Sequence, residues 1–311
     1  MNRYFIALLL LPLSIFAQTL EQKMKAMPVS NLENGITITF DEPENLRSKP
    51  AKVIIYALPN GNTTAQTFGK KLAKGDDWHF DIQHIGAQTS FIRNEDQKHA
   101  YVIVYLENAL KSWPAWRRQT KNADSMIYKI VEDIHLKYKE VKPRLILNGH
   151  SGGGSFIFGF INSQPEIPNY IERISFLDAT YGYETEKHQR KLTNWLREKH
   201  KSLQVIAYND SVVVYNGKPL VSPTGGTWYR SKMMAKDLKN LNFEEDTAQL
   251  KWTNQSSSVA ITLLKNPEAK IYHTVLVEKN GFIHSIFNGT KYTNKNYLFW
   301  GKRAYESFIL E

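Results

Sequence analysis

The feature that most constrains this chain is a serine between glycines, set between an apolar run of strand length and an apolar run of helical length. Residues 143–148 are predicted to form a strand, the Gly-His-Ser-Gly-Gly pattern at 149–153 a sharp turn, and the residues that follow a helix. A serine at this corner projects its hydroxyl outward, and the free N–H groups and positive dipole end of the new helix point toward the same place. This context predicts that Ser151 is a nucleophile rather than part of an ordinary glycine-rich turn.

With this strand, turn and helix, the chain resembles the α/β-hydrolase superfamily of serine hydrolases, residues 149–153 being its nucleophile elbow. The resemblance implies an oxyanion hole made by the N–H of the residue after the nucleophile, here Gly152, and by a donor in the loop after an earlier strand. The chain has Asn60-Gly61 where the family often has His-Gly. Asn62 is therefore the candidate second donor, with Gly61 next and a plain turn as the alternative.

Apolar segments of strand length alternate with helical segments between Lys52 and Tyr208. Residues 52–58 are almost continuously apolar, which is typical of a strand covered on both faces of a parallel sheet. The fold class is therefore predicted as α/β, with a mostly parallel central sheet and helices on both faces. No repeat or linker marks a second domain, so residues 18–311 are predicted to form one catalytic domain.

A serine hydroxyl needs a histidine to take its proton and a carboxylate to orient that histidine. In the family that this chain resembles, serine, acid and histidine follow in that order at strand ends. Ser151, Asp210 and His284 fit the order, and Asp178, directly after the strand that follows the turn, is the alternative acid. His273 is assigned to the interior of a last strand at 271–277, and for that reason His284 is preferred as the base.

Residues 1–17 have a basic start, a short apolar core and a small residue at the end, which predicts a signal peptide and a secreted or periplasmic protein. The apolar run is shorter than the roughly 20 residues of a membrane span. The chain has no cysteine and a net charge of +10. In an exported protein this excess favours an anionic envelope surface over nucleic acid, and a simply solvated surface is the other reading.

Two further segments have alternative interpretations. Asp77, Asp81 and His84 suggest a metal site, a cleft lining or an ordinary helix start, and Trp113 and Trp116 suggest a sugar-stacking surface, a lid or core packing. The triad itself implies no cofactor and no metal.

The sequence therefore predicts an exported carboxylesterase that acts on carbohydrate-linked or small-molecule esters. A serine peptidase or amidase on envelope peptides, and a catalytically silent binding protein on the same fold, are the alternatives, because fold alone does not separate these functions.

Overall fold

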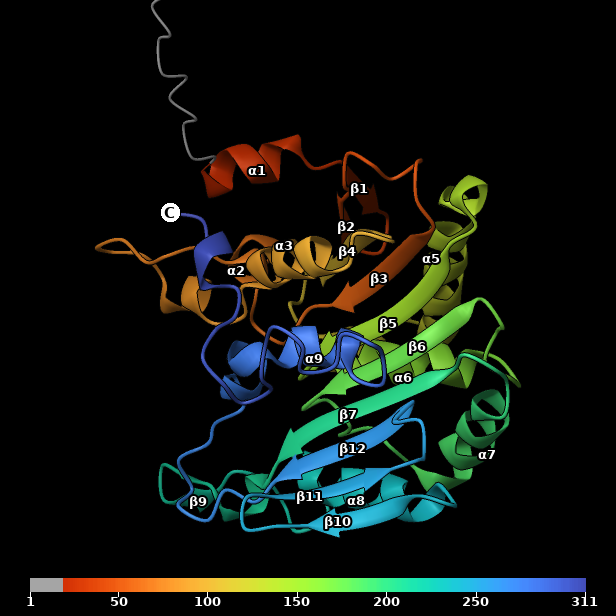
Figure 1. Cartoon of the computed structure of the whole chain (residues 1–311), viewed down its shortest axis with the longest axis vertical. Coiled ribbons are helices and arrows are strands. Elements are labelled where there is room, and N and C mark those ends of the chain that lie inside the picture. The colour runs from red at the N-terminus through yellow and green to blue at the C-terminus, as the bar shows by residue number, and fades with distance from the viewer. Residues whose placement is uncertain (1–18) are drawn as a thin grey trace, which may run out of the picture.

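The computed structural model describes residues 19–311. Its centre is a ten-stranded sheet in the order β1-β2-β4-β3-β5-β6-β7-β12-β11-β10, shown in Figure 1. The strands from β4 to β12 in this order run parallel, and antiparallel strands extend the sheet at both edges. The predicted fold class, a mostly parallel central sheet with helices on both faces, is confirmed.

The strands of this sheet are short and regular. They are β1 (Val29–Leu32), β2 (Ile36–Asp41), β3 (Ala51–Ala57), β4 (Ala100–Asn108), β5 (Arg144–His150), β6 (Ile171–Leu177), β7 (Ser202–Tyr208), β10 (Asn242–Glu245), β11 (Gln249–Thr253) and β12 (Val259–Leu264). A separate small hairpin is formed by β8 (Val214–Tyr215) and β9 (Lys218–Pro219).

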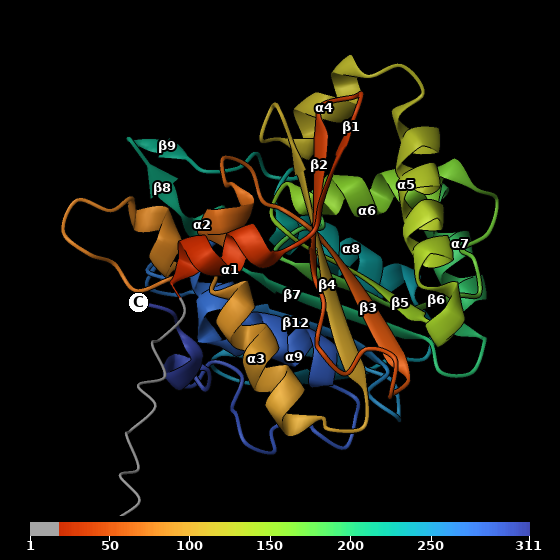
Figure 2. The ribbon, with the colours of Figure 1, turned by 90° about the horizontal axis from the view of Figure 1, so that it is seen from above.

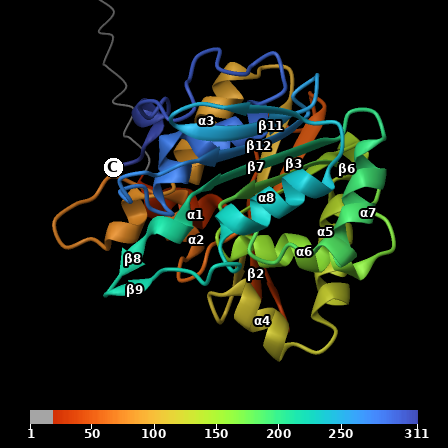
Figure 3. The same ribbon diagram turned by 90° about the horizontal axis from the view of Figure 1, so that it is seen from below.

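The helices divide between the two faces of the sheet, as Figures 2 and 3 show. One face is covered by α3 (Ile85–Glu95) and α9 (Phe282–Phe287), with α1 (Leu20–Ala26) and α2 (Thr64–Phe68) beside them. The other face is covered by α4 (Trp113–Gln119), α5 (Ala123–Lys137), α6 (Gly153–Ser163), α7 (Thr185–Leu196) and α8 (Thr227–Asp237).

The apolar side chains of the central strands alternate between these two layers. Val53 and Ile55 belong to the core beneath α5 and α6, whereas Ile54 and Tyr56 pack beneath α3 and α9. A strand buried on both faces needs an almost continuous apolar sequence, and residues 52–58 have one for this reason.

The predicted last strand at 271–277 is wrong. Residues 271–274 are loop, Val275 begins a helical segment, and a π-helical turn at Val277–Gly281 leads into α9. Tertiary packing overrides the local β-propensity of this segment. Leu276 and Val277 are fully buried, and the Val277 carbonyl accepts a hydrogen bond from the Gln88 side chain. The last strand is β12 instead, and the antiparallel strands β10 and β11 beside it were not predicted.

The order of the strands determines where a site can form. From β3 the chain first adds β4 on one side and then places β5 on the other, so the direction of winding reverses at β3 and β5. In open parallel sheets, ligands bind at this reversal, outside the carboxyl ends of the strands. The loop after β3 and the turn after β5 lie there.

Within residues 19–311, the helices are all too short or too polar to cross a bilayer. The predicted signal peptide at 1–17 lies outside the described residues.

Candidate active site

Ser151 follows directly after β5 and has a left-handed backbone conformation, with φ of 56°. This region is uncommon for a residue with a side chain, and it persists only where the surrounding structure holds it. The turn is tight because α6 packs closely: a Cβ on Gly153 would overlap the Ala57 carbonyl of β3, and one on Gly154 would overlap the Ala179 carbonyl. The structure therefore places Ser151 at a strained strand-to-helix corner, as its neighbours in the sequence predict.

Asp178 follows β6 as Ser151 follows β5, and its φ of 46° is also left-handed. The Ser151 N–H donates to the Leu177 carbonyl over 3.1 Å, so the two strand ends lie side by side. The Asp178 carboxylate is fully buried, and its Oδ2 lies 2.5 Å from Nδ1 of His273. Since a carboxylate accepts, Nδ1 of His273 carries the proton, and Nε2 is left as the basic nitrogen.

His150, the last residue of β5, contacts the loop that carries His273. Its Nε2 lies 3.2 Å from the His273 carbonyl oxygen, and the centres of the two rings are 4.4 Å apart. Burial lowers the pKa of His150 well below its ordinary value, and the neighbouring imidazole of His273 lowers it further. His150 is therefore neutral. Its contact with the His273 carbonyl places His273 next to the turn that carries Ser151.

Asp210 lies two residues after β7, at the same edge of the sheet, but it does not contact a histidine among residues 19–311. Its Oδ2 accepts the backbone N–H of Thr227 at 2.7 Å, and its Oδ1 accepts that of Trp228 at 3.4 Å. It thus caps the beginning of α8. The Thr227 hydroxyl bonds to Asp178 and lies 3.2 Å from Asp210, so it links the two aspartates.

The structure does not bring His284 to this cluster. His284 belongs to α9, is 7% exposed, and lies with Nδ1 3.1 Å from the Tyr297 hydroxyl and its ring stacked on Phe299. Burial lowers its pKa to about 3. The predicted pairing of His284 with Asp210 is corrected accordingly: the histidine and carboxylate that meet beside the turn are His273 and Asp178. The error came from placing His273 inside a strand that does not exist.

The loop after β3 lies against the turn at Gly152. A Cβ on Gly152 would overlap the side-chain oxygen of Asn60, so these two residues are in direct contact. The Gly61 N–H already donates to the Lys111 carbonyl at 2.8 Å, which leaves Asn62 as the candidate donor of this loop. Asn62 is 6% exposed, and its side-chain nitrogen has no hydrogen-bond partner in the described part of the chain.

The two alternative segments have structural roles. Trp113 and Trp116 are 1% and 3% exposed in α4, and Trp113 packs edge-on against Phe156 of α6, so they belong to the core.

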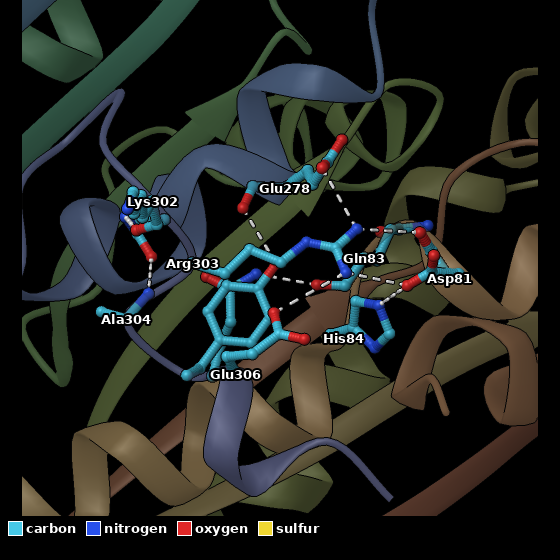
Figure 4. A network of polar contacts seen from close by, with 11 residues as sticks. Asp81, Gln83, His84, Glu278, Lys302, Arg303, Ala304 and Glu306 are labelled. Atoms are coloured by element: carbon cyan, nitrogen blue, oxygen red, sulfur yellow. Dashed lines mark hydrogen bonds and ion pairs between the residues drawn. The ribbon is translucent and has the colours of Figure 1, made fainter. Parts of the chain in front are cut away.

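Asp81 and His84 belong to a polar network with Arg303 and Glu278, shown in Figure 4. Asp81 bonds both the His84 imidazole and the Arg303 guanidinium, at 2.6 and 2.9 Å. Across residues 19–311, no group of three or more acidic, histidine or cysteine side chains is arranged to hold a metal ion.

The arrangement of these elements is the α/β-hydrolase fold, and comparison with a solved structure supports this fold for the chain. A thermostable esterase matches with a TM-score of 0.50 and 12% identity, over 81% of this chain and 58% of that chain. An acetyl xylan esterase from Aspergillus awamori matches with a TM-score of 0.44 and 11% identity, over 80% and 94% of the two chains. A poly(3-hydroxybutyrate) depolymerase from Bordetella parapertussis matches with a TM-score of 0.40 and 12% identity, over 69% and 78%.

The chain thus spans less than two thirds of the thermostable esterase. No protein-family model matches the sequence, and a search of curated proteins found no match. The resemblance first seen in the residues around Ser151 is confirmed at the level of the fold.

Proposed function

We propose that this protein is an exported serine carboxylesterase in which Ser151 is the nucleophile, His273 the general base and Asp178 the acid that orients it. The observation that carries the proposal is the Asp178–His273 hydrogen bond, formed at the strand end next to the strained Ser151 turn. His273 would take the proton of the Ser151 hydroxyl as that oxygen attacks the ester carbonyl, and would return it to the departing alcohol.

The negative oxygen of the tetrahedral intermediate needs donors fixed in advance. The Gly152 N–H, at the beginning of the eleven-residue helix α6, and the Asn62 N–H, in the loop packed on that turn, are the proposed pair. The helix dipole adds a favourable field at the same point.

Esters are favoured over amides as substrates because an alcohol leaves more readily than an amine, and no feature of the sequence indicates an extended peptide cleft. Two exposed tyrosines flank the histidine: the ring centre of Tyr181 lies 6.4 Å from that of His273, and Tyr272 precedes it in the chain. Aromatic faces at this position suit the flat face of a sugar or an aryl group. The proposed substrates are therefore carbohydrate-linked or small-molecule esters.

Export is proposed from the charge and apolar pattern of residues 1–17. The net charge is +10 for the whole chain and about +9 once Arg3 is removed with residues 1–17, and in an extracytoplasmic location it would favour contact with an anionic envelope surface.

The test uses the purified chain from residue 18 onward. A fluorophosphonate probe should label the parent protein and leave Ser151→Ala unlabelled, and turnover of a p-nitrophenyl ester should fall by about 10⁴ to 10⁶ in that variant. Matched ester and anilide substrates with one acyl group, together with acetylated sugars, then define the class. Activity of Ser151→Ala within about tenfold of the parent, or a higher specificity constant for the anilide than for every ester, would contradict the proposal.

A further inference from the structure

Two carboxyl groups are buried side by side behind the proposed catalytic histidine. Asp178 and Asp210 are 0% and 1% exposed, and both contact the side chain of one residue, Thr227. Within residues 19–311, no lysine or arginine forms an ion pair with either carboxyl group; the sole basic partner is His273. Two negative charges this close, without a lysine or arginine between them, are strongly unfavourable in a buried site.

The hydrogen bonds of the Thr227 hydroxyl also indicate that one of the two carboxyl groups carries a proton. A hydroxyl has one proton to donate, and the shorter contact of Thr227 Oγ1 is with Oδ1 of Asp178. Its second contact, 3.2 Å to Oδ2 of Asp210, joins two oxygens that repel each other unless the carboxyl group carries a proton.

The remaining surroundings do not supply a positive charge to Asp210. The buried phenol of Tyr208 lies near both carboxyl groups, and burial, followed by the charges of these two aspartates, raises its pKa, so it is neutral and adds no positive charge. Arg230, one turn further along α8, donates to the Tyr183 carbonyl instead.

The carboxyl group of Asp210 also packs directly on Gly226, where a Cβ would overlap both of its oxygens. The beginning of α8 contributes two amide donors to Asp210. Burial and the charge of Asp178 outweigh these donors and raise the pKa of Asp210.

We propose that Asp178 and Asp210 carry a single negative charge between them: Asp210 is protonated and donates to Thr227, Thr227 donates to Asp178, and Asp178 is the carboxylate that faces His273. Thr227 and Asp210 are then positioning residues, because they fix Oδ1 of Asp178 and direct its Oδ2 at the imidazole. The catalytic part of this inference rests on the proposed function, whereas the location of the proton does not.

The location of the proton is tested without any substrate. Asp210→Asn replaces a protonated acid by a neutral group of the same shape, and Asp96→Asn is the matched control. Asp96 is 2% exposed, and although burial raises its pKa, donors from His99, Tyr292, Tyr101 and the Lys98 amide together lower it. An infrared difference spectrum near neutral pH should show the C=O band of a protonated carboxyl group lost in Asp210→Asn and unchanged in Asp96→Asn.

Unfolding in urea as a function of pH gives a second readout. A group whose pKa is raised in the folded state contributes stability that is lost as the pH rises from its unfolded pKa to its folded pKa. The folding equilibrium constant of the parent should therefore fall, relative to that of Asp210→Asn, by about tenfold for each pH unit above about pH 4. Asp96→Asn should show no such change relative to the parent above about pH 4, because a carboxyl group whose pKa is lowered in the folded state changes stability only below that range. If Asp210→Asn shows neither the loss of the C=O band nor this gain in stability, the inference is overturned.

Kinetics test the positioning role. Asp178→Asn should lose about 10⁴ in kcat/KM. Asp210→Asn should lose far less than Asp178→Asn, because its amide N–H₂ can still donate to the Thr227 hydroxyl. Thr227→Val should lower kcat about tenfold with little change in KM, and Thr227→Ser should restore it. A folded Asp210→Asn variant as inactive as Asp178→Asn would place the charge on Asp210 and overturn the inference. If the parent itself hydrolyses no ester, the proposed function fails, and the infrared and unfolding measurements still decide where the proton is.

Discussion

Separate replacement of His273 and His284 is the clearest test of which histidine belongs to the proposed active site. His273 contacts Asp178 at 2.5 Å beside the serine turn, whereas His284 contacts the Tyr297 hydroxyl at 3.1 Å inside α9. We expect His273→Ala to lower kcat by about 10⁴ or more, which corresponds to at least about 5.5 kcal/mol of barrier. We expect His284→Phe to keep kcat within about threefold, since it removes one hydrogen bond in a core contact.

We expect His284→Phe to change the free energy of unfolding rather than the activity, and the size of the change follows from the burial of the His284 side chain. At neutral pH the variant should lose about 1 kcal/mol, the ordinary worth of one hydrogen bond. The pKa of His284 is lowered to about 3 in the folded protein, from about 6.5 in the unfolded chain. Its contribution to stability is thus present above about pH 6.5 and is lost as the pH falls toward 3. Between neutral pH and about pH 4.5 the parent should lose about 3 kcal/mol through this group, and the variant should not.

Hydrolysis of a p-nitrophenyl ester, labelling by a fluorophosphonate and urea unfolding at the two pH values measure these effects on the same preparations. Labelling should be abolished in His273→Ala and retained in His284→Phe. A His273→Ala variant that is folded and active within about tenfold of the parent would refute the assignment. Loss of labelling in a His284→Phe variant that is as stable as the parent would return the base to His284.

Two further predictions concern the elements around the site. Trp113→Ala should destabilise the fold by about 3 to 5 kcal/mol in urea unfolding and leave KM unchanged, because the side chain is core; a raised KM for a sugar ester without loss of stability would contradict this. Gly154→Ala should destabilise by about 3 kcal/mol or more, because its Cβ would meet the Ala179 carbonyl, and a parent-like urea midpoint would show that α6 does not pack as closely as described.

The residues near one another in the sequence were sufficient for much of this description. The turn at Ser151 was predictable because strand, glycines and helix are all local, and the apolar runs at 52–58 and 203–208 predicted covered parallel strands because their periodicity reflects burial on both faces. The position of Asp178 at a strand end was also predictable from the sequence, although its contact with His273 was not.

The pairing of histidine and acid was decided only by the tertiary structure. Residues 271–277 have strand-like composition, yet the burial of Leu276 and Val277 against α3 and α9 makes them loop and helix, and this change brings His273 to Asp178. Which carboxylate a histidine meets depends on how strand ends and loops distant in sequence are arranged, and no local pattern contains that information. For the same reason the sequence shows two aspartates after successive strands, and only the fold shows that Thr227 joins them.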